Sequence, residues 1–338
     1  MVMGKRTALI VWLSGIAAVV CLTLWSGADL VANAVFAVGF GSVLVVIARA
    51  IAVAGAGVGW WLLFPSEQRP PIGTCVLLRF VREGTNALLP LAQIGGEAIG
   101  ARCLALTGTR TSVAAASVIV DVLVQAATQF AFALVGVTML TAMGGDETVV
   151  RASAIGVAVA LPALSGFFLA QRRGGHRMLK GLLARLSGGR DWMAFGAIDD
   201  LYARLDALYS RRDGMAAAFL VHLAVWCFGA IEVWIVLSCM GYHVTYGEAV
   251  IIESLMHAAR GAAFVVPGAL GVQEGGLIVL CAIFGVPAEA ALALSLVKRV
   301  PDIVLGLPGV IVWQAMEGRR YFATQRAAAG LGRARPER

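Results

Sequence analysis

Two stretches of this chain follow one template. Residues 84–108 read GTNALLPLAQIGGEAIGARCLALTG, and residues 261–285 read GAAFVVPGALGVQEGGLIVLCAIFG. Proline and glutamate are both scarce in the chain and unfavourable in an apolar segment, because proline breaks a helix and lipid disfavours a carboxylate. A repeat interrupted at corresponding places in two halves is typical of transporters, whose binding site lies at the interruptions. At an offset of 177 residues the matched positions are Gly84 and Gly261, Pro90 and Pro267, Glu97 and Glu274, and Gly108 and Gly285.

The composition is that of a membrane protein. Of the 338 residues, 59% are hydrophobic and 14% are charged, with a mean hydropathy of +0.84, whereas soluble domains carry about 25% charged residues. The net charge of +7 lies in short segments beside apolar stretches, where basic residues set topology and contact anionic headgroups. We therefore expect a membrane lipid as partner and no nucleic acid. The six cysteines form no CxxC pair, so we expect no metal site, and no motif indicates a cofactor.

Apolar runs predict the membrane spans, since a spanning helix needs roughly 20 apolar residues. The two repeat stretches, about 72–107 and 248–285, are also apolar, but a proline breaks each near its middle. Each is therefore either two full spans or one re-entrant hairpin of two short helices. The predicted spans lie at about 7–25, 30–63, 113–143, 149–170, 214–240 and 288–316.

The distribution of lysine and arginine decides between these alternatives. The connection 171–213 carries nine and the segment after 317 carries six, whereas 26–29, 144–148 and 241–247 carry none. Basic connections face the cytoplasm, and all of them fall on one side only if each broken stretch enters and leaves on the same face. The sequence thus predicts an all-α polytopic membrane protein. It has six spanning helices plus two oppositely oriented re-entrant helical hairpins in an inverted repeat, with both termini cytoplasmic.

The whole chain is predicted to form a single integral membrane domain. Between the repeats, Leu201, Leu205 and Leu208 share one helical face, which predicts an amphipathic helix on the cytoplasmic surface or a solvated helical linker. We expect the last residues, RAAAGLGRARPER, to be disordered. The predicted parts are a first repeat at about 30–143, the cytoplasmic amphipathic connection at about 171–213, a second repeat at about 214–316 and a basic tail at 317–338.

Ionisable side chains inside the bilayer are unfavourable by a few kcal/mol each and persist where they are paired, hydrated or used. The tips PLAQIGGE and PGALGVQEGG each precede a half-helix whose free N–H groups favour an anion such as a phosphate headgroup. Nearby basic side chains would add charge-assisted hydrogen bonds. The predicted substrate-binding residues are Arg82, Asn86, Gln93, Glu97, Arg260, Gln273, Glu274, Lys298 and Arg299, and the predicted charge-pairing or coupling residues are Glu83, Asp121 and Asp302.

Two features of these residues bear on the interpretation. At the repeat offset Asp121 coincides with Lys298, so an acid of one half and a base of the other are expected to pair at the pseudo-twofold centre. Glu97 and Glu274 are either part of the binding site or structural, as helix caps or as partners that neutralise an arginine.

Three motifs carry a resemblance to a known family: RFVREGTNALLPLAQIGGEAIGARCLAL, VIVDVLVQAATQ and PGALGVQEGGLIVLCAIFGVPAEAALALSLVKRVPDIVLGLPG. With them the chain, over about residues 5–320, resembles the hopanoid-biosynthesis-associated membrane protein family HpnL. That family belongs to the group named after the flippase-like transmembrane region of lysylphosphatidylglycerol synthase. The resemblance implies a bacterial inner-membrane protein that moves a lipid between leaflets. We expect no soluble acyltransferase domain like that of the full synthase, so the resemblance does not imply aminoacyl transfer.

The sequence favours a lipid transporter, flippase or scramblase, for a hopanoid-related or anionic lipid. One alternative is a membrane enzyme or enzyme subunit that modifies a hopanoid or polyprenyl lipid, with the carboxylates as acid and base. The sequence has no HExxH, GxSxG or Walker A motif, and we therefore expect no enzymatic activity. Another alternative is an ion or small-solute transporter of similar architecture.

Overall fold

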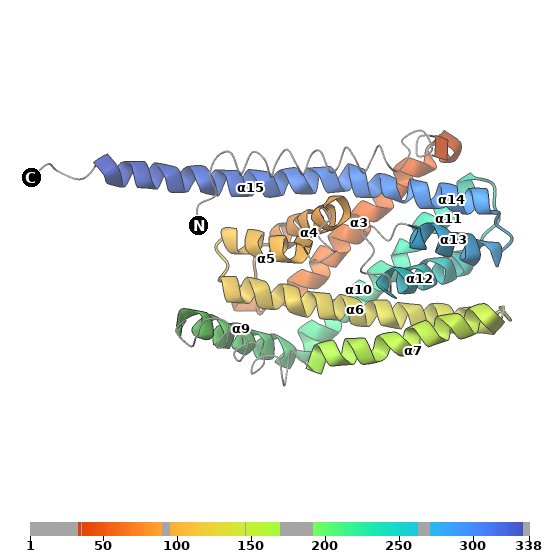
Figure 1. Cartoon of the computed structure of the whole chain (residues 1–338), viewed down its shortest axis with the longest axis horizontal. Helices are drawn as coiled ribbons and strands as arrows, with labels where there is room; N and C mark the ends of the chain where they lie inside the picture. Colours follow the sequence, from red (N-terminus) through yellow and green to blue (C-terminus); the bar gives the residue numbers. More distant parts are fainter. Residues whose placement is uncertain are drawn as a thin grey trace, which may run out of the picture.

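The computed structural model describes residues 33–34, 36–89, 95–145, 147–169, 192–262 and 271–333. Within these ranges every regular element is a helix, and the helices form one bundle around the long α6 (Figure 1). In chain order they are α3 (Gly41–Leu62), η1 (Ser66–Gln68), α4 (Ile72–Leu88), α5 (Gly95–Leu106), α6 (Thr111–Ala142), α7 (Glu147–Leu169), α9 (Trp192–Ser210), α10 (Arg212–Gly229), α11 (Ile231–Cys239), α12 (Tyr246–Ala262), α13 (Val272–Ala282), α14 (Ala288–Val297) and α15 (Arg299–Arg333).

The repeat seen in the sequence recurs in the helices. α5 begins at Gly95 and α13 begins at Val272, 177 residues later. Each is followed by a glycine with positive φ at the same register, Gly108 (102°) and Gly285 (72°). Glycine is favoured there because a Cβ atom is strained in that conformation. The two halves therefore share one order of elements: a long helix, a pair of short helices, and a second long helix.

Among the described residues, three helical segments are long and apolar enough to cross a membrane: α3, α6 and the combined segment Arg212–Cys239 of α10 and α11. They coincide with the spans predicted near 30–63, 113–143 and 214–240. The predicted span at 288–316 is divided into α14 and α15, which meet at Lys298. The predicted span at 7–25 lies outside the described residues, as do Pro90, Gln93 and Pro267 at the predicted tips.

The helices of the two broken stretches are short. α4 and α12 have 17 residues each, α5 has 12 and α13 has 11. At about 1.5 Å per residue, α5 extends for roughly 18 Å, whereas a hydrocarbon core is about 30 Å thick. By length alone, α5 and α13 cannot cross a bilayer.

The two pairs of short helices lie toward opposite ends of α6 (Figure 1). The N-terminal part of α6 contacts α4 through Asp121, whereas its C-terminal part contacts α12 through Gln129, whose amide donates to the carbonyl of His257 (2.8 Å). Each pair lies in its own apolar core. α3 contributes to both cores, with Trp60 in the first and Val45 in the second.

The structure bears on two expectations about single segments, α9 and the end of the chain. Leu205 and Leu208 of α9 are buried in the core of the first half, so this amphipathic helix packs on the protein and is not a solvated linker. α15 continues to Arg333, so the expectation of a disordered segment is wrong for residues 326–333. Alanine and arginine, which dominate this segment, have high helix propensity and extend the helix.

Glycines allow α15 to lie directly against α4. A Cβ atom on Gly84 would overlap the carbonyl group of Gly306, and one on Gly306 would lie 2.9 Å from Leu88. Backbone approach of this kind is how small residues stabilise helix pairs in membranes, where lipid provides no hydrophobic drive between helices. This contact brings the second half of the chain against the first pair of short helices.

We expect Gly84→Ala to destabilise the protein, because its methyl group would meet a backbone carbonyl that cannot rotate away. Overpacking of this kind typically costs about 1–3 kcal/mol. The matched control is Gly73→Ala, also in α4, where a Cβ would meet nothing within 4 Å. Thermal melting in detergent should show a lower midpoint for Gly84→Ala alone, and equal midpoints would contradict the packing.

Candidate functional site

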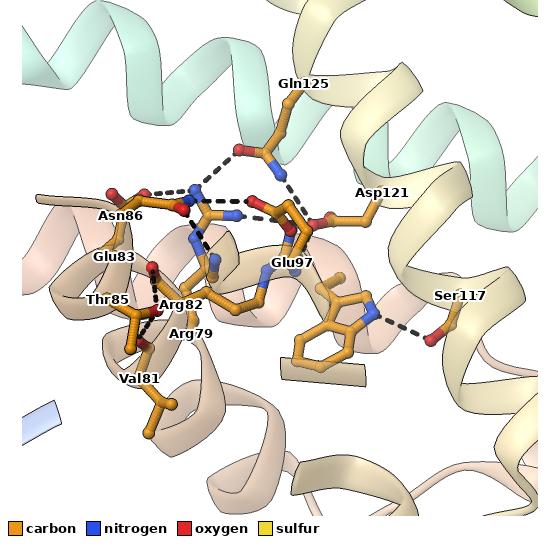
Figure 2. Close-up of polar contacts among 12 residues, drawn as sticks. Arg79, Val81, Arg82, Glu83, Thr85, Asn86, Glu97, Ser117, Asp121 and Gln125 are labelled. Carbon is orange, nitrogen blue, oxygen red and sulfur yellow. Dashed lines mark hydrogen bonds and ion pairs between the residues drawn. The ribbon is translucent and has the colours of Figure 1, made fainter. Parts of the chain in front are cut away.

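Asp121 is a carboxylate buried in the middle of the bundle. It lies on α6 and has no exposed surface. Its Oδ2 accepts hydrogen bonds from Arg82 Nη1 (2.7 Å) and Gln125 Nε2 (2.7 Å) (Figure 2). Its Oδ1 lies 3.0 Å from His222 Nε2. Helices α4, α6 and α10 therefore supply the partners that make this burial tolerable, because an unpaired buried charge is strongly unfavourable.

Arg82 is the cation at the centre of this cluster. It is fully buried on α4, and its guanidinium lies 4.9 Å from the ring of Trp60, within cation–π range. It also makes an ion pair with Glu97 of α5. The aliphatic part of Arg82 packs directly on Gly100, where a Cβ would overlap it, so α5 passes close to this side chain. Trp60 donates to Ser117 Oγ (3.2 Å), which holds the ring in place.

α4 carries a polar face, and its side chains Arg79, Arg82, Glu83 and Asn86 lie around Asp121 and Glu97 (Figure 2). Arg79 Nη2 donates to Glu83 and to the Oε1 atom of Gln125 (2.7 Å). Asn86 accepts from the backbone N–H of Gly96 (2.8 Å) and donates more weakly to Glu97 Oε1 (3.3 Å). We call Arg79, Arg82, Glu83, Asn86, Glu97, Asp121 and Gln125 the Asp121 cluster.

A second cluster surrounds Lys298, at the junction of α14 and α15. Its Nζ atom donates to both carboxylate oxygens of Glu253 (2.7 and 2.8 Å) and lies 3.3 Å from Glu232. His257 Nε2 lies 3.1 Å from Glu253 Oε1. Lys298, Glu253 and Glu232 are all buried. Here the centre is a base and its partners are acids, the reverse of the Asp121 cluster.

Arg49 joins the two halves. From α3 it binds Glu232 of α11 through two hydrogen bonds of 2.7 Å, a bidentate arrangement that adds geometric specificity. Its Nη1 atom also lies 3.8 Å from Asp302. Sequence reasoning left Arg49, Glu232, His222 and Glu253 out of the predicted site. The signal that could have identified them in the sequence is an ionisable side chain within an apolar stretch.

The expected pairing of Asp121 with Lys298 is wrong. Asp121 is paired with Arg82, and Lys298 is paired with Glu253 and Glu232. The two residues occupy equivalent positions in the repeat but lie beside different pairs of short helices, so each has its own ion-pair partners. Asp302 and Glu83, also predicted to pair charges, lie at the exposed edges of the two clusters, with side chains 37% and 45% exposed.

Glu274 is a helix cap and an ion-pair partner, one of the two interpretations left open above. It accepts from the N–H of Gly271 at the start of α13 (2.7 Å), from Ser295 Oγ (3.3 Å) and from Arg299. Gln273 donates to Ser295 Oγ (3.1 Å). Among the described residues, Arg260 has no carboxylate within ion-pair distance, and Gln93 lies outside them.

Several buried nitrogen and oxygen atoms of the Asp121 cluster lack hydrogen bonds to the described residues. These are Nε and Nη1 of Arg79 and Nε and Nη2 of Arg82, together with the Oε2 atom of Glu97. Arg82 Nη2 touches Glu97 Oε2 and Arg79 Nη1 lies 3.5 Å from Asp121, but neither contact has hydrogen-bond geometry. Buried groups of this kind are rare in proteins, and they mark places where another acceptor fits.

We expect Asp121→Asn to destabilise the protein strongly, because it leaves Arg79 and Arg82 buried without their central anion. Removing one partner of a buried pair typically costs about 3–5 kcal/mol. Asp206→Asn, an exposed carboxylate on α9, is the control. A detergent melting experiment in which both variants lose the same amount would contradict the central role of Asp121.

Comparison with known proteins gives one match. A family model described as "Lysylphosphatidylglycerol synthase TM region" matches residues 11–309. No curated protein and no solved structure matches the chain.

Proposed function

Since the chain belongs to the lysylphosphatidylglycerol synthase TM region family of membrane proteins, we propose that it is a lipid transporter, a flippase or scramblase. It moves a lipid with an anionic headgroup between the leaflets of a bacterial inner membrane. The observation that carries this proposal is the Asp121 cluster, in which the buried side chains of Arg79 and Arg82 keep nitrogen atoms without hydrogen bonds to the described residues, inside an apolar bundle. The resemblance of the sequence motifs to the HpnL family supports a hopanoid-related lipid as one candidate cargo.

In the proposed mechanism, the headgroup binds to the guanidinium groups of Arg82 and Arg79 while the acyl chains remain in the bilayer. Both arginines are buried, where charge-assisted hydrogen bonds are shorter and stronger than in water. The side chain of Glu97 is 21% exposed and that of Glu83 is 45% exposed, so the cluster is accessible on one side. Apolar side chains exposed on the bundle, such as Ile47 and Ile51 of α3, suit lipid tails.

The Lys298 cluster, in this proposal, holds the halves together while the first site is used. The contact between Arg49 of the first repeat and Glu232 of the second crosses the interface between them. In lipid, an ion that loses its partner during a movement is unfavourable. The Arg49–Glu232 contact holds α3 and α11 together. It therefore favours movement of a pair of short helices against these fixed helices.

The proposed topology has six spans and two re-entrant hairpins that open on opposite sides, with both termini cytoplasmic. The short lengths of α5 and α13 support it, as does the position of the two pairs toward opposite ends of α6 (Figure 1). The alternative, in which each pair forms two full spans, needs helices of roughly 20 residues.

Single cysteines in a cysteine-free background test this topology. We expect Ser66→Cys and Thr107→Cys, exposed positions before α4 and after α5, to react with a membrane-impermeant maleimide from the same side. His243→Cys and Glu289→Cys, exposed positions around the second pair, should react from the other side. Labelling of Ser66→Cys and Thr107→Cys from opposite sides would rule out a re-entrant first hairpin.

Transport is tested in reconstituted liposomes with a fluorescent anionic phospholipid and a membrane-impermeant quencher. We expect the wild-type protein to accelerate exchange between leaflets, and Arg82→Gln to slow it at least about tenfold, because hydrogen bonds to charged groups contribute about 1.5–3 kcal/mol. Arg102→Gln is the matched control, since this arginine is 54% exposed and pairs with Glu317 at the surface.

Equal rates for Arg82→Gln and wild type, or no acceleration by the wild-type protein, would contradict the proposed function. A new lipid product formed by the purified protein would favour a membrane enzyme, with the buried carboxylates as acid and base. Conductance through vesicles without lipid exchange would favour an ion transporter.

A further inference from the structure

The two glutamates at equivalent positions of the repeat have different environments. Glu274 is well bonded, because it caps α13 at Gly271 and accepts from Ser295 and Arg299. Glu97 lies in the first turn of α5, where its only hydrogen bond from the described residues is the weak one from Asn86 (3.3 Å). Its other oxygen touches Arg82 without hydrogen-bond geometry.

The two arginines of this cluster, Arg79 and Arg82, also have buried nitrogen atoms that make no hydrogen bond to the described residues. Arg82 is 1% exposed and Arg79 is 8% exposed, yet each has two nitrogen atoms without a hydrogen bond to the described residues. A carboxylate presents two oxygens in one plane. A phosphate group presents three or four in a tetrahedron and matches the forks of two arginines better. Glu97 therefore fills the position of an anion without satisfying the donors around it.

From this geometry we infer that the Glu97 carboxylate is a displaceable occupant of a phosphate site formed by Arg82 and Arg79. A phosphate ester enters by taking the place of Glu97 on Arg82, and Glu97 returns when the phosphate leaves. The ligand class is a phosphate group, either as a lipid headgroup or as the free anion. This inference rests on the proposed function, because it names the headgroup chemistry and the release step of that same site.

The side chain of Glu97 can move while Asp121 cannot. Glu97 is partly exposed and lies one residue from Gly96, near the start of α5, whereas Asp121 is fully buried and bound by three side chains. Exchange therefore leaves the Arg82–Asp121 pair intact. Because Glu97 competes with the ligand, it lowers the affinity of the site and speeds release, as a transporter requires.

The test measures binding of short-chain phosphatidylglycerol and of inorganic phosphate to the detergent-solubilised full chain, by the ligand-dependent shift in melting temperature and by native mass spectrometry. We expect Glu97→Gln to bind the phospholipid at least about tenfold more tightly than wild type. Glu97→Asp, which keeps the charge but withdraws it by one methylene, should bind with intermediate affinity, and it serves as the test if Glu97→Gln fails to fold.

Glu274→Gln is the matched control, because it removes a carboxylate at the equivalent position without exposing Arg82. Its affinity should equal that of wild type. Equal gains for Glu97→Gln and Glu274→Gln would overturn the inference, since the effect would then be one of net charge. Glu97→Asp with wild-type affinity, or weaker binding by Glu97→Gln, would overturn it as well. A gain seen with phosphatidylglycerol supports a lipid headgroup as ligand, and a gain confined to inorganic phosphate supports the site with the free anion as ligand.

Binding and transport separate the two proposals. Tighter binding by Glu97→Gln together with no transport by wild type supports the phosphate site and contradicts lipid transport. Wild-type transport together with no effect of Glu97→Gln on phosphate binding contradicts the displaceable carboxylate and leaves lipid transport standing. If both proposals hold, Glu97→Gln should bind more tightly and transport more slowly, because release becomes limiting.

Discussion

The buried contact between Asp121 and Arg82 constrains the structure around it. Neither side chain reaches solvent, so every charge must be balanced by another protein group. Arg82 comes from α4 and Asp121 from α6, while His222 reaches the same carboxylate from α10 and Glu97 reaches the guanidinium from α5. Four helices are thereby held in one relative position, because moving any of them leaves a charge unpaired in a medium of low dielectric constant.

The two halves share one order of helices, but the charges of their buried clusters are reversed. Asp121 and Lys298 are equivalent in the repeat, yet the first is surrounded by bases and the second by acids. The first cluster contains arginine nitrogen atoms without hydrogen bonds to the described residues. In the second cluster, Lys298 is bound by Glu253 and lies close to Glu232. In the proposed function, the first half carries the binding chemistry and the second supports it.

Close helix packing makes this arrangement possible in a chain with little hydrophobic drive between its helices. Gly84 and Gly306 let α4 and α15 touch through their backbones, and Gly100 lets Arg82 lie across α5. The same closeness excludes water from the guanidinium groups, which strengthens their interaction with an anion. Packing and chemistry thus depend on the same small residues, and Gly84 is itself one of the matched positions of the repeat.

Much of the architecture followed from the sequence, because helix length, apolar composition and the spacing of proline, glycine and glutamate act locally. The helical class, the register of α5 and α13, the long apolar helices and the polar face of α4 are all consequences of residues near one another in the chain. Partners were not predictable in this way. Asp121 meets Arg82 and Lys298 meets Glu253 because of how helices cross, and Arg49 meets Glu232 across 183 positions of sequence. The sequence by itself determined which charges lie within apolar stretches. Only the tertiary structure decided which of them neutralise each other, because Coulomb energy depends on distance in space and not on separation along the chain.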